Sequence, residues 1–187
     1  MTILALVRHG QTDWNLEGRY QGQADPPIND AGRSQARTLA DQLGGRRFDA
    51  IYSSDLRRAV ETATIIAERL NLPVRLDPRL REVSQGEWEG VVSEEIKARY
   101  PAEWAARKKD VVHSRPPGGE SAAELAQRIR RAADDIARDW PGGHALVVSH
   151  GLALATLLCL ARALPLDQAY DLIPGNAWSG EIEWPPG

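Results

Sequence analysis

Cysteine, lysine and histidine are scarce in this chain of 187 residues, and each shortage excludes a class of site. The single cysteine, Cys159, rules out an internal disulfide and a Cys-rich zinc site, so the fold does not depend on an oxidising compartment. Three of the 23 basic residues are Lys, and 26 acidic residues bring the formal net charge to −3. The broadly basic surface typical of nucleic-acid binding is therefore absent. Histidine chemistry can draw only on His9, His113, His144 and His150.

Long apolar runs are also missing. The run at 3–7 is shorter than the apolar region of a signal peptide, and the run at 152–160 covers about half a membrane span. The composition, 42% hydrophobic and 26% charged, is typical of a folded domain rather than a disordered chain. We therefore predict a cytoplasmic protein of one domain, with no membrane partner and no nucleic-acid partner.

Short apolar runs alternate with helical patterns along the chain. Strands are predicted at 3–7, 48–52, 73–76 and 145–149, with an edge strand at 181–184. Helices are predicted at 31–43, 55–70, 121–140 and 152–163, with Asn29 or Asp30, Asp55 and Ser121 as N-caps. The stretch 82–119 interrupts the alternation and is predicted as a helical excursion from the sheet, with a helix at 94–100. This order of elements indicates an α/β fold with helices on both faces of the sheet.

Arginine or histidine side chains follow three of the predicted strands. They belong to Arg8-His9-Gly10, to the segment 53–58 that contains Arg58, and to His150-Gly151. Because ligands of α/β sheets bind outside the carboxyl ends of the strands, these three segments are expected to meet at one ligand-binding crevice. The glycine after each histidine would allow a ligand to approach the backbone closely.

Two arginines and two histidines around one point would bind a phosphoryl dianion. Arginine binds such oxyanions bidentately, and a neutral histidine is a competent nucleophile that forms a covalent intermediate. The leaving alcohol then needs a proton donor. Glu82 and Glu87 are the candidates, and their spacing in the sequence does not choose between them.

Five ordered blocks of the sequence resemble the signature of the histidine phosphatase superfamily, the phosphoglycerate mutase-like proteins. The first is Leu-Val-Arg-His-Gly-Gln-Thr-Asp-Trp-Asn at 6–15. The other matching blocks lie at 19–26, 53–63, 80–90 and 147–151, the last followed by Asn176. Together they span almost the whole chain in the order that the family shows.

The resemblance implies a role for each matching residue. His9 would be the phosphorylated nucleophile, and Glu82 the general acid that protonates the leaving oxygen and later acts as a base toward water. The phosphoryl group would be surrounded by Arg8, Arg58 and His150. The substrate entry would be lined by Asn15, Gln21 and Gly22, which would also contact phosphate.

The same resemblance implies the architecture and the partners. The expected fold is a three-layer α/β/α sandwich with a mostly parallel central sheet. A single histidine phosphatase domain would cover 1–187, with the helical excursion at about 84–119 near the active site. The substrate would be a small phosphorylated metabolite, no metal or other cofactor is implied, and the protein would be a monomer or a homodimer.

Phosphatase and phosphoglycerate mutase are the two activities that this signature allows. Gln11-Thr12 stands where mutases of the family commonly carry Glu-Ser, and Glu82 is followed by Val-Ser-Gln-Gly-Glu-Trp-Glu-Gly rather than Arg-His-Tyr-Gly. The chain is also shorter than typical cofactor-dependent mutases, so a more open site would admit water. These features favour hydrolysis, with the mutase as the alternative.

Two other functions would use only some of the residues that match the family signature. A zinc hydrolase could use His9, His150 and Glu82 as ligands, although two arginines oppose a cation at that place. A non-enzymatic phosphate-binding module would be expected to lack a catalytic residue.

Cys159 is predicted to lie in the core and His113 on the surface, whereas Arg57 could contact substrate or solvent. Candidates for recognising the rest of the substrate are Ser84, Gln85, Arg107, Lys108, Lys109 and Arg115.

Overall fold

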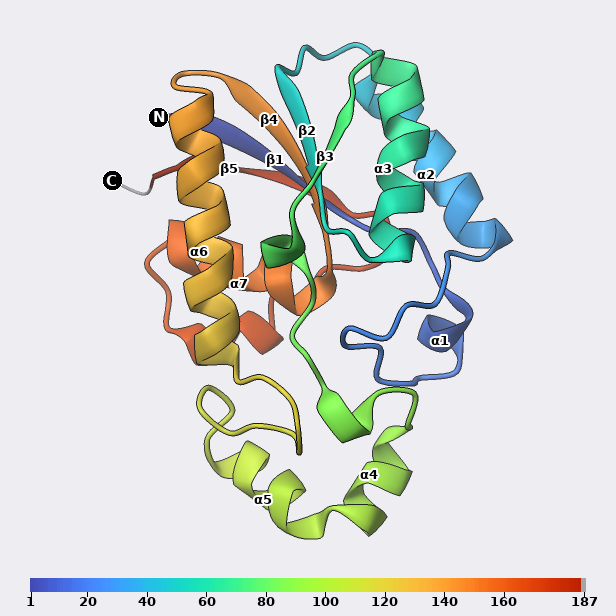
Figure 1. Ribbon diagram of the computed structural model, residues 1–187, viewed down its shortest axis with the longest axis vertical. Helices are drawn as coiled ribbons and strands as arrows, with labels where there is room; N and C mark the ends of the chain where they lie inside the picture. Colours follow the sequence, from blue (N-terminus) through green and yellow to red (C-terminus); the bar gives the residue numbers. More distant parts are fainter. Residues whose placement is uncertain (186–187) are drawn as a thin grey trace.

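A twisted sheet of five strands forms the centre of the computed structural model, which describes residues 1–185 (Figure 1). The strand order is β3-β2-β4-β1-β5. The parallel strands are β1 (Thr2–Arg8), β2 (Ala50–Ser53), β3 (Val74–Leu76) and β4 (His144–Ser149). The last strand, β5 (Ser179–Trp184), runs antiparallel to β1 at the edge. The predicted strands and the mostly parallel sheet are thus confirmed.

Helices cover both faces of the sheet, because successive side chains of a strand point to opposite sides. On one side, Ala5 and Val7 of β1 pack with α2 (Asp30–Leu43) and α3 (Arg57–Leu70). On the other side, Leu4 and Leu6 pack with α6 (Ala122–Asp139) and α7 (Gly151–Ala161). Figure 1 shows the two helical layers on opposite sides of the strands, which confirms the predicted three-layer sandwich.

Two of the three predicted N-caps are confirmed, and one is wrong. The Asn29 side chain accepts the N–H of Gly32, and Ser121 forms a capping box with Glu124. Asp55 does not cap α3, whose N-cap is Leu56 without a side-chain hydrogen bond. Both carboxylate oxygens of Asp55 instead accept hydrogen bonds from Arg81, at 2.6 and 2.5 Å. A bidentate ion pair is a stronger partner for this carboxylate than one helical N–H.

The excursion from the sheet forms a further layer beyond the carboxyl ends of the strands (Figure 1). It contains α4 (Ser93–Arg99), close to the helix predicted there, and α5 (Pro101–Lys109), which the sequence analysis missed. Its two ends are tied together, because Ser84 exchanges hydrogen bonds with the N–H and the carboxylate of Glu120, at 2.9 and 3.2 Å. The buried Trp88 ring lies inside this layer, against Trp104.

Four short helices complete the described chain. They are α1 (Asp13–Leu16) and the 3-10 helices Pro78–Leu80, Gly86–Trp88 and Leu166–Tyr170. Within residues 1–185, no helix combines the length and the apolar character needed to cross a membrane.

Candidate active site

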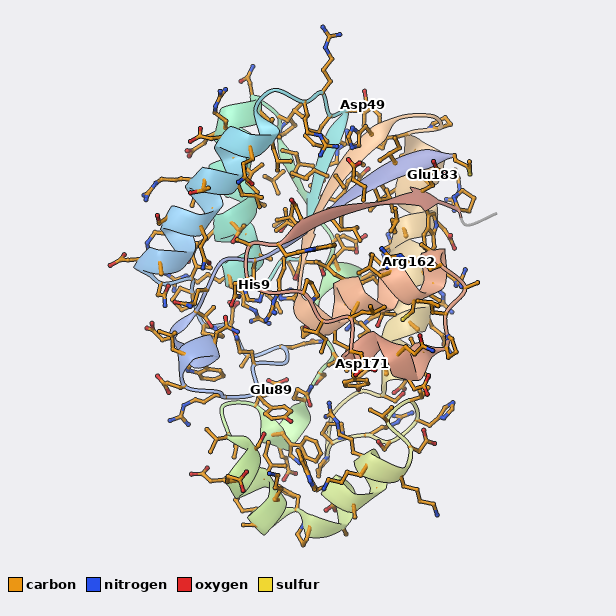
Figure 2. All side chains as sticks on the ribbon, turned by 180° about the vertical axis from the view of Figure 1, so that it is seen from behind. His9, Asp49, Glu89, Arg162, Asp171 and Glu183 are labelled. Carbon is orange, nitrogen blue, oxygen red and sulfur yellow. The ribbon has the colours of Figure 1, made fainter. Side chains whose placement is uncertain are left out.

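His9 and His150 lie side by side because the strands before them are neighbours. β1 and β4 pair in parallel, with Arg8 opposite Ser149, so that the next residues leave the sheet together. The two imidazole rings are 5.2 Å apart between centroids and almost fully buried. Figure 2 labels His9 at the end of the sheet that faces the excursion, far from Asp49 at the opposite end. The predicted meeting of the strand ends is therefore found for these two segments.

A hydrogen bond fixes the tautomer of His9. Its Nδ1 lies 2.7 Å from the carbonyl oxygen of Gly10, and because a carbonyl can only accept, Nδ1 carries the proton. The lone pair is then on Nε2. Burial lowers the pKa of His9 well below its ordinary value, and the charges of Arg58 and Arg8 lower it further. The imidazole is therefore neutral at pH 7, as a nucleophile must be.

Arg58 links the end of β2 to His150. It lies in the first turn of α3, is 1% exposed, and donates from Nε to Nδ1 of His150 at 3.2 Å. Its two Nη atoms donate to the carbonyls of Ala24 and Gly22, each at 2.7 Å. Burial lowers the pKa of Arg58 to about 10, so the guanidinium stays charged at neutral pH.

His150 is held between Arg58 and Ser54. Its Nε2 lies 2.8 Å from the Ser54 hydroxyl, which places this serine at the site. Ser54 belongs to the segment after β2, and no sequence pattern indicates a role for it. Burial, followed by the charge of Arg58, lowers the pKa of His150 well below its ordinary value. This ring is therefore neutral too.

Arg8 has an N–H donor, Nε, that is unpaired within residues 1–185, and it lines the cavity beside Glu82. One Nη atom donates to the carbonyl of Pro174, whereas Nε is buried and has no hydrogen-bond partner within the described residues. An unpaired buried donor is costly, so it fits a ligand oxygen better than an apolar neighbour. Arg8 and Glu82 line one cavity of about 410 Å³.

Glu82 is the carboxylate that the fold brings to the cavity. Its oxygens accept the N–H groups of Val83 at 3.0 Å, Leu152 at 3.0 Å and Ala153 at 3.1 Å. The last two are N–H groups of the first turn of α7, which have no acceptor within the helix, and a negative charge is favoured there. The alternative, Glu87, accepts from the Tyr100 hydroxyl at 2.9 Å and does not line the cavity.

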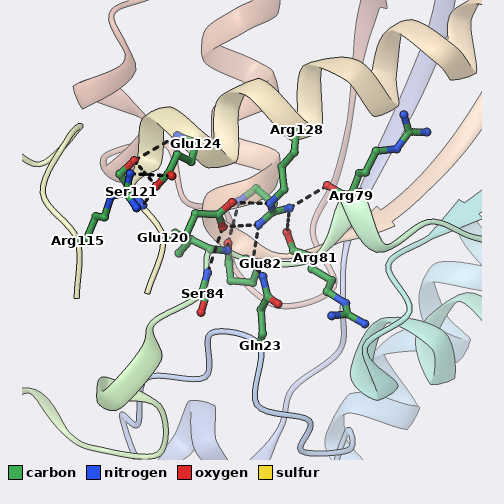
Figure 3. A network of polar contacts seen from close by, with 12 residues as sticks. Gln23, Arg79, Arg81, Glu82, Ser84, Arg115, Glu120, Ser121, Glu124 and Arg128 are labelled. Atoms are coloured by element: carbon green, nitrogen blue, oxygen red, sulfur yellow. Dashed lines mark hydrogen bonds and ion pairs between the residues drawn. The ribbon is translucent and has the colours of Figure 1, made fainter. Parts of the chain in front are cut away.

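Arg128 of α6 holds the segment that carries Glu82 (Figure 3). Its guanidinium donates to the carbonyls of Arg79, Arg81 and Glu82 at 2.7 to 2.8 Å. It also pairs with Glu120 at 2.7 Å, and only 20% of the Arg128 side chain is exposed. No motif pointed to this residue, since an arginine within an amphipathic helix is usually at the surface.

The residues expected at the substrate entry lie around the cavity. Asn15, Gln21 and Gly22 all line it. Asn15 Oδ1 accepts from Asn176 Nδ2 at 3.1 Å, and that amide also donates to the His9 carbonyl at 3.3 Å. Gln21 Oε1 is buried without a hydrogen-bond partner in the described part of the chain.

Four further side chains that line the cavity have no role suggested by the sequence. They are Trp14, Arg19, Tyr20 and Tyr170. Of the candidates in the excursion, Gln85 and Arg107 line the cavity. Lys108 and Lys109 are exposed, and Arg115 pairs with Glu124 at 2.8 Å. His113 is exposed and Cys159 is buried, as expected.

The glycine at position 10 makes room for protein backbone rather than for the ligand that was expected there. A Cβ atom at Gly10 would lie 2.5 Å from the carbonyl oxygen of Gly32, so the close neighbour is the backbone of α2 and not a ligand. At Gly151, by contrast, the glycine borders the cavity, and a Cβ atom would lie 2.9 Å from Cγ2 of Ile173 and 3.4 Å from Cζ of Arg8.

The geometry does not support the zinc alternative. Among residues 1–185, no three His, Cys, Asp or Glu side chains lie together as a metal site would require. His150 and Glu82 are occupied by Arg58 and by backbone N–H groups, which are cationic or donating partners. This arrangement suits an anion.

A neutral imidazole and two guanidinium groups at the carboxyl edge of a mostly parallel sheet define an enzyme that handles phosphoryl groups. The chain belongs to the histidine phosphatase superfamily (branch 1), whose family model matches residues 4–187.

Known proteins resemble the chain over most of its length. It is 33% identical to phosphoserine phosphatase 1 of Hydrogenobacter thermophilus over 95% of this chain and 84% of the relative. It is 40% identical to a probable phosphoglycerate mutase GpmB of Yersinia enterocolitica over 88% of this chain and 77% of the relative. A solved structure of mycobacterial glucosyl-3-phosphoglycerate phosphatase in complex with VO3 superposes with a TM-score of 0.88 and 37% identity, covering 97% and 90% of the two chains. The predicted family and enzyme class, a phosphoric monoester hydrolase, are confirmed.

Proposed function

We propose that the protein hydrolyses a small phosphorylated metabolite through a phosphohistidine at His9. The observation that supports this most strongly is the Nδ1–H bond to Gly10, which leaves the Nε2 lone pair on a buried neutral ring beside two guanidiniums. In the first step, an N–P bond forms at Nε2 while the P–O bond to the alcohol breaks. Glu82, which must be protonated in the substrate complex although its free carboxylate accepts three N–H groups, gives its proton to the leaving oxygen.

In the second step, water attacks the phosphohistidine. Glu82, now a carboxylate, takes a proton from this water, the N–P bond breaks, and inorganic phosphate leaves. Arg8 and Arg58 would stabilise the charge that spreads over the phosphoryl oxygens in both steps, with His150 as a third partner. Phosphoryl transfer depends mainly on such positioning and charge stabilisation.

The roles of the entry residues and the extent of the domain are part of this proposal. Asn15, Gln21 and Gly22 would contact the incoming phosphate, and the location of all three around the cavity supports this. Residues 1–187 would act as one domain, with 84–119 as a wall of the site. A cytoplasmic location, the absence of nucleic-acid and membrane partners, and a monomeric or homodimeric state stay predictions.

A direct test traps the intermediate. The enzyme is mixed with a 32P-labelled phosphate monoester and quenched in alkali, where phosphohistidine is stable. We expect label on the peptide that contains His9 and none on the His9→Ala variant, which should also release no phosphate. His113→Ala changes an exposed histidine away from the cavity and serves as the matched control. Full activity of His9→Ala would disprove the mechanism.

The mutase remains the second candidate because the relative from Yersinia enterocolitica is named a probable phosphoglycerate mutase. The names of the phosphoserine phosphatase and of the glucosyl-3-phosphoglycerate phosphatase support hydrolysis instead. Incubation with 3-phosphoglycerate and 2,3-bisphosphoglycerate decides between them. Release of phosphate supports the phosphatase, whereas rapid formation of 2-phosphoglycerate without phosphate release supports the mutase.

A further inference from the structure

Arg107 reaches the active-site cavity from the excursion, on a platform of three aromatic rings. Its guanidinium carbon lies 5.8 Å from the ring centroid of Tyr20, 5.4 Å from that of Trp88 and 5.3 Å from that of Tyr170. These rings come from the loop after α1, from the base of the excursion and from the segment after α7. Contacts of this kind stabilise a cation and fix the plane of the guanidinium. The guanidinium of Arg107 is thus fixed in position by its neighbours.

This guanidinium has no acidic partner. Within residues 1–185, no carboxylate lies within ion-pair distance of Arg107, which donates from Nη1 to Gln85 Oε1 at 3.2 Å. The Tyr170 hydroxyl is a second hydrogen-bond partner of this guanidinium. A guanidinium has five N–H donors, so these two partners do not use all of them. Arg19, which also lines the cavity, is already paired with Glu17. Arg107 therefore has donors left for a ligand.

We propose that Arg107 binds a carboxylate of the substrate, so that the enzyme prefers phosphate monoesters of hydroxy acids. This rests on the proposed phosphatase function. Arg8 and Glu82 line the same cavity as Arg107, so one substrate molecule can contact these two catalytic residues and Arg107 together. A volume of about 410 Å³ is at the small end of ligand pockets, which suits a metabolite of this size. One planar guanidinium matches one planar carboxylate, whereas the phosphoryl group would take the Nε of Arg8, which is unpaired within the described residues.

Two pairs of commercial substrates test this. O-phosphoserine is compared with O-phosphoethanolamine, and 3-phosphoglycerate with glycerol 3-phosphate, because the members of each pair differ only by the carboxylate or its replacement. Release of phosphate is measured as kcat/KM. We expect the wild-type enzyme to favour the carboxylate member of at least one pair by about tenfold or more, as a substrate group with a dedicated charged partner does. This comparison needs no variant.

The variant Arg107→Gln should remove the preference. We expect kcat/KM to fall about tenfold or more for the carboxylate substrates and to change little for O-phosphoethanolamine, glycerol 3-phosphate and p-nitrophenyl phosphate. Arg107→Lys, which keeps the charge without the planar fork, should retain part of the preference. Lys109→Gln removes a charge from the exposed side of the same helix and is the matched control.

The outcomes separate the two proposals. Equal kcat/KM within both wild-type pairs, together with hydrolysis of p-nitrophenyl phosphate, disproves the carboxylate subsite and leaves the phosphatase intact. An equal loss by Arg107→Gln on every substrate also disproves the subsite, because Arg107 would then only support the wall. If no phosphate is released from any of these esters, the proposed phosphatase function fails.

Discussion

The guanidinium of Arg128 donates a hydrogen bond of 2.8 Å to the main-chain carbonyl of Glu82. The same group donates to the carbonyls of Arg79 and Arg81, so three of the four residues 79–82 are hydrogen-bonded to one side chain of α6. Glu120 balances its charge. The Glu82 carboxylate is thus positioned from two sides, through its main chain by Arg128 and through its oxygens by the N–H groups of α7.

Arg128→Ala should harm catalysis in a manner that depends on the leaving group. Without the guanidinium, the carbonyls and Glu120 lose their partner, and we expect the free energy of unfolding to fall by about 2–4 kcal/mol. Because Glu82 is then less well placed, kcat should fall about tenfold for an alkyl phosphate, and less for p-nitrophenyl phosphate. Kinetics on both esters and urea unfolding measure the two effects.

The control for this prediction is Arg131→Ala. Arg131 is exposed on the same helix, so neither kinetics nor stability should change appreciably. If Arg128→Ala slows both esters by the same factor, Arg128 does not act through Glu82.

Glu82→Gln tests the proton donor itself. The amide is similar in size but cannot give a proton, and general acid catalysis contributes typically about 10²–10⁴-fold. We expect a loss in that range for alkyl phosphates and a smaller one for p-nitrophenyl phosphate, whose leaving group needs no proton. Glu87→Gln, which only loses a partner of Tyr100, should retain activity. The reverse result would make Glu87 the acid.

Stability should fall as the pH falls below about 6.5, the ordinary pKa of histidine. Burial lowers the pKa of His9 and His150 in the folded protein, so at acidic pH the unfolded chain binds protons that the folded chain does not. The unfolding free energy should therefore decrease by up to about 1.4 kcal/mol per pH unit for each of them. His144, whose pKa burial also lowers, adds in the same direction.

Urea unfolding at pH 7.5, 6.5 and 5.5 measures this slope, and His150→Gln should reduce it. NMR gives a second check: the imidazole resonances of His9 should not titrate around pH 6.5. A normal titration of His9 in the folded protein would contradict the burial of a neutral ring.

Gly10→Ala should destabilise the protein although glycine there has no unusual backbone angle. Its Cβ atom would meet the Gly32 carbonyl oxygen at 2.5 Å, which forces β1 and α2 apart. We expect a loss of about 1–3 kcal/mol, as for other overpacked sites. Activity should fall too, since Gly10 supplies the acceptor for Nδ1 of His9. Gly45→Ala, with open space around it, is the control in a thermal unfolding experiment.

The sequence predicted the sheet and its strand-end residues well, because both depend on local patterns. Short apolar runs specified the strands, and the positions of His9 and His150 directly after them specified where they meet. Spacing alone did not choose between Glu82 and Glu87, whereas the family resemblance pointed to Glu82. The fold supplies the physical reason, since only Glu82 lies at the N-terminus of α7. Asp55 was misassigned because its partner, Arg81, is 26 residues away. Long-range partners of this kind leave no periodic signal.

The wall of the cavity was hardest to predict. Helix α5 was missed because Pro101 directly follows the predicted helix at 94–100, and its short apolar face has no buried residue. Arg107 was one of several basic candidates, and only packing against Tyr20 and Tyr170 distinguishes it from Lys108 and Lys109. The platform joins three distant segments, so no stretch of sequence contains it.

The hydrogen bonds between Ser84 and Glu120 close the excursion at its base. The chain leaves the body of the protein and returns to it at almost the same point, so the intervening residues form one continuous part of the cavity wall. The first of them also pair with the loop that holds Arg58, because Gly90 donates to the Tyr20 carbonyl and Glu89 accepts the N–H of Gln23. We therefore expect exchange of the part beyond Val92 to change the substrate range without moving His9 or Glu82.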